Sequence, residues 1–294
     1  MSAQRPSTAI LYQTHFIDPV ILGEYRKLKR EAGVFGNVRL LYNTTETPLP
    51  RDLPADVEVF AFNAGDLRRL DYRSKDTSLS SYNVELFLLN FYRQNPAFEY
   101  YWAMEYDVRF SGDWSVLFEA FADNPADLLG TTLYRHPFNP DWVNWRSLIA
   151  PVPLSPHDMI RAFIPIYRIS RRALAELDRA YRNGWGGHCE VTVPTVLAHA
   201  GMRLEDIGGE GEFTAPGNVN RFYRNTPKTR DHFPGSMTFR PVMASAGPEP
   251  NMLWHPVKIR PGMVTGRRRV IVHRLRQWLS RSRALLLPRR LGPS

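Results

Sequence analysis

Apolar runs and amphipathic stretches alternate along the chain up to about residue 207, and this pattern predicts strands and helices in turn. The predicted strands are residues 8–13, 38–42, 57–62, 98–104, 127–130, 160–169 and 203–207. The predicted helices are residues 18–32, 82–93, 114–121, 170–182 and 191–200, with N-caps at Asp18, Ser80 or Ser81, Asp113 and Ser170. Such alternation is typical of an α/β domain with a mainly parallel central sheet flanked by helices.

Two long segments interrupt this alternation. Residues 134–157 are rich in Pro, Trp and His and predict a long ordered loop, while residues 208–250 predict mostly irregular structure. The chain has 294 residues, of which 43% are hydrophobic, and it is long enough for one large domain. We assign this domain to residues 1–262 and a basic helical tail to residues 263–294.

The sequence shows neither a secretory signal nor a candidate membrane span. Residues 1–7 are polar, the apolar run at 8–12 is too short for a signal peptide, and no stretch reaches about 18 apolar residues. Cys189 is the only cysteine, which excludes an intrachain disulfide and fits a reducing cytosol. We therefore expect a cytoplasmic protein that is soluble or lies peripherally on the inner face of the membrane.

Positive charge is concentrated at the C-terminal end of the chain. The net charge is +9, but residues 251–294 alone carry +11, which leaves −2 for the rest. This distribution argues against nucleic acid as a partner, because a nucleic-acid-binding fold is expected to spread basic residues over its body. Within residues 267–287, apolar side chains share one helical face with arginines beside it, which favours an amphipathic helix on an anionic membrane surface. The alternative is a solvated tail that packs one face on the domain.

The first candidate for chemistry is Glu105-Tyr106-Asp107, which follows the apolar strand predicted at 98–104. In an extended backbone, Glu105 and Asp107 point to the same side. Two neighbouring carboxylates repel each other unless a proton or cation intervenes, and Mg²⁺ or Mn²⁺ shared with substrate phosphates is a suitable cation. Arg109 follows on the same side, where it is expected to meet phosphate. The alternative is a pair of solvated acids at a strand end.

A second candidate is the glycine-rich turn Gly184-Trp-Gly-Gly-His-Cys-Glu190. Its glycines permit a tight backbone and close ligand approach. Glu190 stands just before a predicted helix, where it is a candidate general base for an acceptor hydroxyl or, alternatively, an acid that only stabilises the helix N-terminus. His188 is expected to be a structural or substrate contact, and Cys189 is expected to pack in the core.

A third candidate is Trp254-His255-Pro256-Val257-Lys258, a short apolar segment that follows the long irregular stretch. Here His255 is a candidate metal ligand through its imidazole, and Lys258 a candidate phosphate contact. The alternative is a histidine without a ligand role.

From Tyr82 to Lys258 the sequence resembles a poorly characterised family of GT-A-like nucleotide-diphospho-sugar transferases. The block Y-Y-W-A-M-E-Y-D-V-R-F-S-G-D-W at residues 100–114 carries the resemblance, and the turn at 184–190 is similar to the G-W-G-G-acid turn of galactosyltransferases. The resemblance implies a single nucleotide-binding domain in which Asp107, assisted by Glu105, holds Mn²⁺ or Mg²⁺ on the donor diphosphate. It further implies that His255 is a late metal ligand and Glu190 the acceptor-side base.

The resemblance also implies a set of residues near the nucleotide sugar. These are Tyr12, Gln13, Thr14, Asp66, Arg68, Arg109, Trp185, Gly186, Gly187 and Lys258. Because this sequence reads E-Y-D rather than D-x-D, Glu105 is expected to contact either the metal or, in its place, ribose or water.

The expected function is that of a metal-dependent glycosyltransferase that moves a sugar from a UDP- or GDP-type donor to a hydroxyl of a glycan or lipid-linked acceptor. The alternative is a non-catalytic module that binds a nucleotide or glycan and docks through its basic tail. A nucleotidyltransferase is disfavoured, because Gln13-Thr14-His15-Phe16 follows the first strand in place of a Gly-rich loop with a basic residue.

The tail gives a prediction of its own. A variant that ends at Gly266 is expected to lose binding to anionic phospholipid vesicles, because it lacks the apolar and basic residues of 267–287. It should keep nucleotide binding, since the predicted nucleotide contacts all precede Gly266. Vesicle co-sedimentation of the full and shortened chains measures the first effect. Undiminished vesicle binding after truncation would contradict the anchor hypothesis.

Overall fold

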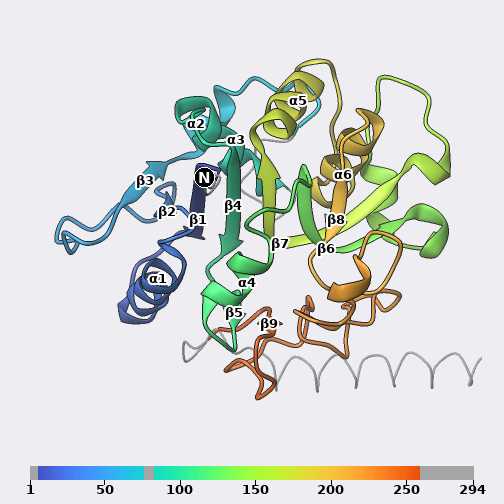
Figure 1. Cartoon of the computed structure of the whole chain (residues 1–294). Helices are drawn as coiled ribbons and strands as arrows, with labels where there is room; N and C mark the ends of the chain where they lie inside the picture. Colours follow the sequence, from blue (N-terminus) through green and yellow to red (C-terminus); the bar gives the residue numbers. More distant parts are fainter. Residues whose placement is uncertain (1–5, 76–82, 259–294) are drawn as a thin grey trace, which may run out of the picture.

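The computed structural model describes residues 6–75 and 83–258 of the chain (Figure 1). Its strands are β1 (Thr8–Thr14), β2 (Asn37–Asn43), β3 (Val59–Phe62), β4 (Tyr100–Glu105), β5 (Arg109–Phe110), β6 (Leu128–Arg135), β7 (Ile160–Ser170), β8 (Leu204–Asp206) and β9 (Leu253–Trp254). Its α-helices are α1 (Pro19–Ala32), α2 (Ala64–Arg68), α3 (Glu85–Gln94), α4 (Trp114–Ala120), α5 (Arg171–Arg182) and α6 (Cys189–His199). Every strand and helix predicted from the sequence is present, with ends shifted by a few residues.

Seven strands form one twisted sheet in the order β3-β2-β1-β4-β7-β6-β8. β3, β2, β1 and β4 run parallel to one another, and β6 runs parallel to β8. β7 is antiparallel to both of its neighbours, β4 and β6. The predicted α/β class with a mainly parallel sheet is thus confirmed, and β7 is the exception.

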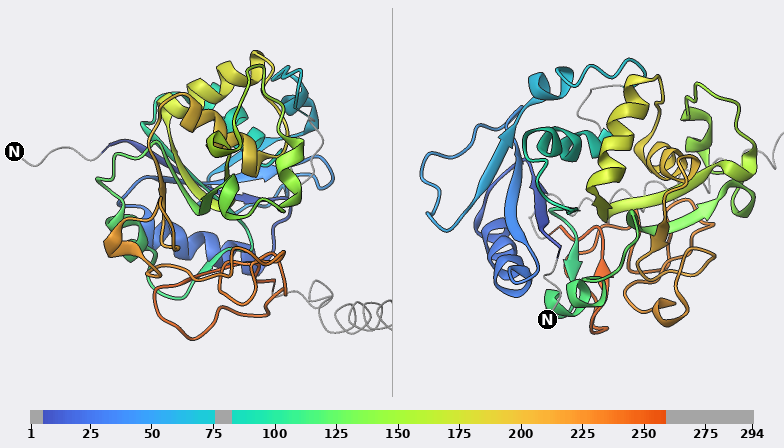
Figure 2. Two further views of the ribbon diagram at one scale, coloured as in Figure 1. Left: turned by 90° about the vertical axis from the view of Figure 1, so that its right-hand side faces the viewer. Right: turned by 45° about the horizontal axis from the view of Figure 1, so that its top comes forward.

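Helices cover the sheet on both faces, which gives three layers (Figure 2). One apolar core lies between the sheet and α3, α5 and α6. A second core lies between the other face and α1 and α4, and it includes Phe222, Tyr223, Met237 and Leu253 from the late irregular segment. The stretch predicted to be irregular is therefore packed against the domain, and it places residues near the end of the described chain below the sheet in the view of Figure 1.

The predicted helix caps are seen where the structure describes them. Asp18 accepts a hydrogen bond from Ile21 N at 2.8 Å, and Pro19 occupies the first helical position. Asp113 and Ser170 likewise accept from backbone N–H groups in the first turns of α4 and α5. The cap predicted at Ser80 or Ser81 lies outside the described residues.

β7 is antiparallel because of how it is connected. Residues 136–159 join it to β6 through short 3₁₀ turns instead of a crossover α-helix, so the chain turns back along the strand it has just left. The first residues of β7 therefore reach the edge of the sheet at which β4 ends. The domain boundary at 262 and the tail at 263–294 lie outside the described residues. In the described ranges, no helix has the length and apolarity needed to cross a membrane.

Candidate active site

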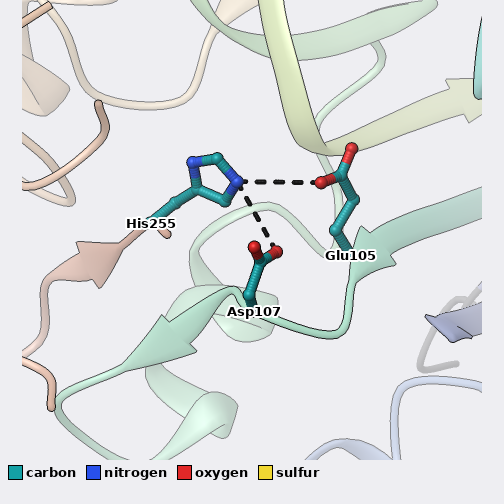
Figure 3. A group of neighbouring side chains, drawn as sticks. All are labelled: Glu105, Asp107 and His255. Carbon is teal, nitrogen blue, oxygen red and sulfur yellow. Dashed lines mark ion pairs between the residues drawn. The ribbon is translucent and has the colours of Figure 1, made fainter. Parts of the chain in front are cut away.

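Three side chains converge beyond the carboxyl end of β4 (Figure 3). One ligand atom from each of Glu105, Asp107 and His255 lies within 4.8 Å of those of the others. His255 Nε2 is 3.7 Å from Glu105 Oε2 and 3.5 Å from Asp107 Oδ1. The structure thus brings together the three residues that the sequence proposed as metal ligands, although 148 positions separate the last two in the sequence.

The β5–β9 ladder brings His255 to the carboxylates. Arg109 pairs with Trp254 in this ladder, and Val257 N donates to the Asp107 carbonyl oxygen at 2.8 Å. A turn, closed by Val108 N to the Glu105 carbonyl at 3.0 Å, separates Glu105 from Asp107. The predicted extended backbone through this motif is therefore wrong. The two carboxylates meet because the chain turns and His255 faces both of them.

Hydrogen bonding fixes which ring nitrogen of His255 faces the carboxylates. Nδ1 lies 2.8 Å from the Thr238 carbonyl oxygen, which accepts only, so Nδ1 carries the proton of this bond. Nε2 is left facing Glu105 and Asp107, as a metal-binding imidazole with an outer hydrogen-bond partner would be. Burial disfavours the charged ring, but the two carboxylates outweigh burial and raise the pKa of His255.

The donor set fits a hard divalent cation. Asp107 is 3% exposed, and its Oδ1 is buried without a hydrogen-bond partner among the described residues. Lys258 Nζ lies 3.3 Å from the other oxygen, Oδ2. An unsatisfied buried carboxylate oxygen beside a second carboxylate and an oriented imidazole suits Mg²⁺ or Mn²⁺, with open positions left for substrate oxygens.

A pocket of about 290 Å³ opens next to this cluster, at the carboxyl ends of β1, β2 and β4. Its lining residues are Gln13, Thr14, His15, Leu41, Asn43, Glu46, Phe62, Val84, Phe87, Glu105 and Tyr106. The pocket combines aromatic and aliphatic walls with a few polar groups, as small-molecule sites commonly do. Glu105 belongs to both the pocket and the ligand cluster, so one bound molecule can reach from the pocket to the cluster.

Gln13 and Thr14 lie in this pocket, while Tyr12 does not. Gln13 is 6% exposed and its Nε2 is buried without a hydrogen-bond partner among the described residues. Thr14 Oγ1 donates to the Phe16 carbonyl at 2.7 Å and so shapes the turn after β1. Because side chains alternate along a strand, Tyr12 points into the core on the other face, where its hydroxyl donates to the Tyr106 carbonyl.

Arg109 does not face the carboxylates as expected. Its NH1 donates to the carbonyl oxygens of Tyr106 and Val108 at 2.6 and 2.9 Å, and its Nε lies 3.2 Å from Glu24 Oε1. The guanidinium of Arg109 therefore makes its contacts in the core below the cluster of Glu105, Asp107 and His255. This arrangement corrects the expectation that Arg109 meets phosphate.

Two further expected contacts lie away from the pocket lining. Asp66 forms the capping box of α2 with Asn63 and pairs with Arg69. Arg68 is exposed at the end of the same short helix. Neither side chain belongs to the pocket wall or to the ligand cluster. Their proposed role in binding the nucleotide sugar therefore gains no support from the geometry.

The glycine-rich turn packs against other parts of the chain. A Cβ at Gly186 would clash with the Ser74 backbone, and one at Gly187, where φ is +105°, would clash with the Ser147 backbone. Trp185 is buried in the core under α6. Close packing against other backbone segments thus explains why glycines occupy these positions. The turn that they form places the start of α6 at the edge of the sheet.

Glu190 is held in this first turn of α6. Its side chain is 5% exposed, and its Oε2 has no hydrogen-bond partner among the described residues. Burial raises the pKa of Glu190 to about 8, against the opposite effect of the Arg161 charge, while Glu105 adds to the rise. His188 Nδ1 lies 4.0 Å from Oε2, and burial lowers the pKa of His188 to about 4, so the neighbouring ring is neutral. A buried carboxyl group with a pKa near the working pH is suited to take up a proton.

Several residues at the site were missed from the sequence. Arg161, at the start of β7, contacts His232 and lies under the ring of Trp142. The available signal was a charged residue inside the apolar run at 160–169, which a buried strand accommodates only with a specific partner. Trp142 and His232 belong to irregular segments, whose contacts no periodicity reveals.

No protein-family model matches the chain, and no curated protein matches its sequence. Among solved structures, a glycosyltransferase involved in the glycosylation of the major capsid of PBCV-1 is 12% identical, with a TM-score of 0.29 over 59% of this chain and 64% of its own. The 4-diphosphocytidyl-2C-methyl-D-erythritol synthase from Anaerococcus prevotii is 11% identical, with a TM-score of 0.41 over 74% and 97% of the two chains. The inositol-1-phosphate CTP transferase from T. maritima is 11% identical, with a TM-score of 0.35 over 75% and 94%.

By their descriptions, these solved structures are one glycosyltransferase and two nucleotidyltransferases; the resemblance of residues 100–114 led us to expect the first kind, and the second was disfavoured. This chain matches slightly less than two thirds of the length of the capsid glycosyltransferase. With TM-scores below 0.5, the similarities assign no role to any side chain. The function is therefore argued from the residues of this chain.

Proposed function

We propose that this protein is a metal-dependent glycosyltransferase that uses a nucleotide-sugar donor. The observation that carries the proposal is the cluster of Glu105, Asp107 and His255 beside a partly apolar pocket at the carboxyl ends of the parallel strands. Ligands of open α/β sheets bind at this edge. A nucleoside in the pocket places its diphosphate beside the cluster, because Glu105 lines both.

A divalent cation held by Glu105, Asp107 and His255 would neutralise the diphosphate leaving group. Lys258, half-buried over the Tyr106 ring and 3.3 Å from Asp107, is placed to contact a phosphate oxygen beside them. Gln13 presents an amide without a partner among the described residues to the nucleoside side of the pocket. The protein itself thus contributes orientation and charge at the leaving group.

Glu190 takes the proton from the acceptor hydroxyl in this proposal. Its carboxyl group is buried and has an unpartnered oxygen, and its charge is coupled to those of Glu105 and His255. A buried acid that served only the N-terminus of α6 would be expected to pair its oxygens with the free N–H groups of that turn. In α6 the cap is instead His188, whose Nδ1 accepts from Glu190 N at 3.2 Å.

Calorimetric titration of UDP and GDP, each with Mn²⁺, Mg²⁺ or EDTA, tests the donor side. We expect at least one nucleotide diphosphate to bind with a divalent cation and to lose most of its affinity in EDTA, because the carboxylates repel phosphates that no cation bridges. Equal affinity with EDTA and with metal would rule out the metal-dependent donor site. The matching UDP- or GDP-sugars are then assayed for metal-dependent release of the nucleotide.

A nucleotidyltransferase would need the same edge of the sheet, and product analysis separates the two reactions. Transfer of a sugar releases a nucleoside diphosphate, while synthesis of a nucleotide sugar from a nucleoside triphosphate releases pyrophosphate. β1 ends with Gln13 and Thr14, and the exposed His15 and then Phe16 follow it, without a lysine or arginine to meet a triphosphate. We therefore expect a nucleoside diphosphate as the product.

A further inference from the structure

Two arginines are almost completely buried in β7, and they differ in how their charge is accommodated. Arg161 is 1% exposed and Arg168 is 2% exposed. A buried guanidinium is costly unless hydrogen bonds or an anion compensate for its lost hydration. The partners of the two side chains therefore indicate what each is for.

The two terminal nitrogens of Arg168 are satisfied by the backbone, although its Nε, like that of Arg161, is buried without a partner among the described residues. Its NH1 and NH2 donate to the carbonyl oxygens of Phe121, Asn124 and Ala126 at 2.7, 2.5 and 3.1 Å, and Tyr100 lies against the guanidinium at 4.2 Å. Three carbonyls from one segment make Arg168 a structural residue that fixes the chain after α4.

The buried charge of Arg161 has fewer hydrogen-bond partners than that of Arg168. Among the described residues, its guanidinium makes one hydrogen bond, from NH2 to His232 Nε2 at 2.5 Å, and its Nε is buried without a partner. Burial and the charge of Arg161 lower the pKa of His232 to about 3, so the imidazole is neutral and accepts through Nε2. No carboxylate among the described residues lies within ion-pair distance of Arg161. The charge of Glu190 acts on Arg161 from beyond that distance, so the guanidinium has an anion nearby but no direct ion pair.

Arg161 lies between the candidate base and the metal-ligand cluster. On one side the Trp142 ring covers its guanidinium at 4.3 Å, and the same ring meets His188, which is 4.0 Å from Glu190. On the other side His232 packs edge-on against Phe163, which in turn packs against His255. The half-buried Trp142 is the side chain that a ligand would contact or displace to reach Arg161.

We infer that Arg161 binds an oxyanion, a carboxylate or a phosphate, carried by the acceptor substrate. The guanidinium offers the planar fork of donors that pairs with such groups. Assignment of this anion to the acceptor rests on the proposed function. Arg161 contacts Trp142, which contacts His188 beside the proposed base Glu190. The donor phosphates are instead assigned to Lys258, beside Asp107. The aromatic ring of Trp142 beside the cation supplies a face on which a sugar ring can pack.

The test compares the full chain with Arg161→Met and with its matched control, Arg168→Met. Protein saturated with UDP and Mg²⁺, so that the donor site is filled, is melted in increasing acetate or methyl phosphate against chloride of equal ionic strength. We expect at least one of the two anions to raise the Tm of the wild-type protein, and Arg161→Met to abolish this rise. Acetate alone indicates a carboxylate on the acceptor, and methyl phosphate alone indicates a phosphate.

Stability and donor affinity give independent readouts. Arg161→Met is expected to keep its Tm within about 2 °C of wild type or to exceed it, because it removes a buried charge that has one hydrogen bond and no direct ion pair, while Arg168→Met loses at least about 4 °C with its three carbonyl partners. UDP–Mg²⁺ affinity should be unchanged in Arg161→Met. Three results for Arg161→Met would each overturn the inference: a large loss of Tm, a tenfold loss of UDP affinity, or a rise of Tm with acetate or methyl phosphate equal to that of the wild type. If UDP fails to bind at all but the Arg161-dependent anion effect remains, the anion site stands and the proposed donor is refuted.

Discussion

Asp107→Asn is expected to abolish metal-dependent nucleotide binding. The side chain is nearly isosteric, but it replaces the buried carboxylate that faces both His255 Nε2 and Lys258 Nζ. A hard divalent cation depends on this negative charge, and a neutral amide oxygen is a far weaker ligand for it. Loss of outer partners of metal ligands alone costs about 10–100-fold in affinity, so we expect the loss of Mn²⁺-dependent UDP or GDP affinity to be at least about 100-fold.

Two companion variants make the Asp107 result interpretable. Asp113→Asn makes the same chemical change at the exposed cap of α4, outside the site, and should bind nucleotide like wild type. Glu105→Gln should weaken binding less than Asp107→Asn, because Glu105 is half-buried and its carboxylate is partly solvated. A folded Asp107→Asn protein with unchanged calorimetric affinity would remove Asp107 from the metal site.

Glu190→Gln is expected to reduce sugar transfer by about 10²–10⁴-fold, the usual contribution of a positioned general base. The variant keeps the shape of the side chain and removes its ability to accept a proton. Because Glu190 lies at the start of α6 and not in the pocket, the affinity for nucleotide and metal should stay within about threefold of wild type. Rate assays at saturating donor, together with calorimetry, separate the two effects.

The pH dependence of the sugar-transfer rate should reflect the protonation of Glu190. Burial raises the pKa of Glu190 to about 8, so the carboxylate needed for proton uptake forms only as the pH rises towards that value. We expect kcat/KM of the wild type to increase from pH 6 and to level off at or below about pH 8, since a bound cation nearby favours the carboxylate. In Glu190→Gln the remaining activity should lose this rise. A rise that persists in the variant would assign it to another group.

Much of the architecture follows from local patterns in the sequence. Asp18 and Ser170 mark helix starts through side-chain chemistry that needs no distant partner, and apolar runs such as residues 160–169 predict strands because a strand such as β7 is buried on both faces. Local patterns are insufficient where the backbone leaves a regular element. The extended geometry expected through Glu105-Tyr106-Asp107 is replaced by a turn, and Arg109 consequently faces the core and not the site.

The sequence also could not separate residues whose roles depend on their neighbours, since Tyr12 and Gln13 were both expected near the nucleotide sugar. Gln13 lines the pocket and Tyr12 does not, because alternation along β1 points them to opposite faces. Arg161 and Arg168 look alike in the sequence, each a charge in an apolar run. Only their partners, one neutral ring or three carbonyls, distinguish them.

By itself the sequence determined the α/β class, the order of the elements and the candidates Asp107, Glu190 and His255, because these depend on local periodicity and residue chemistry. The tertiary structure decided which of these candidates meet. The β5–β9 ladder brings His255 to Asp107, although 148 positions separate them in the sequence. The antiparallel direction of β7 brings Arg161 to the edge where β4 ends. Both depend on strand pairing between distant segments, which local sequence does not encode.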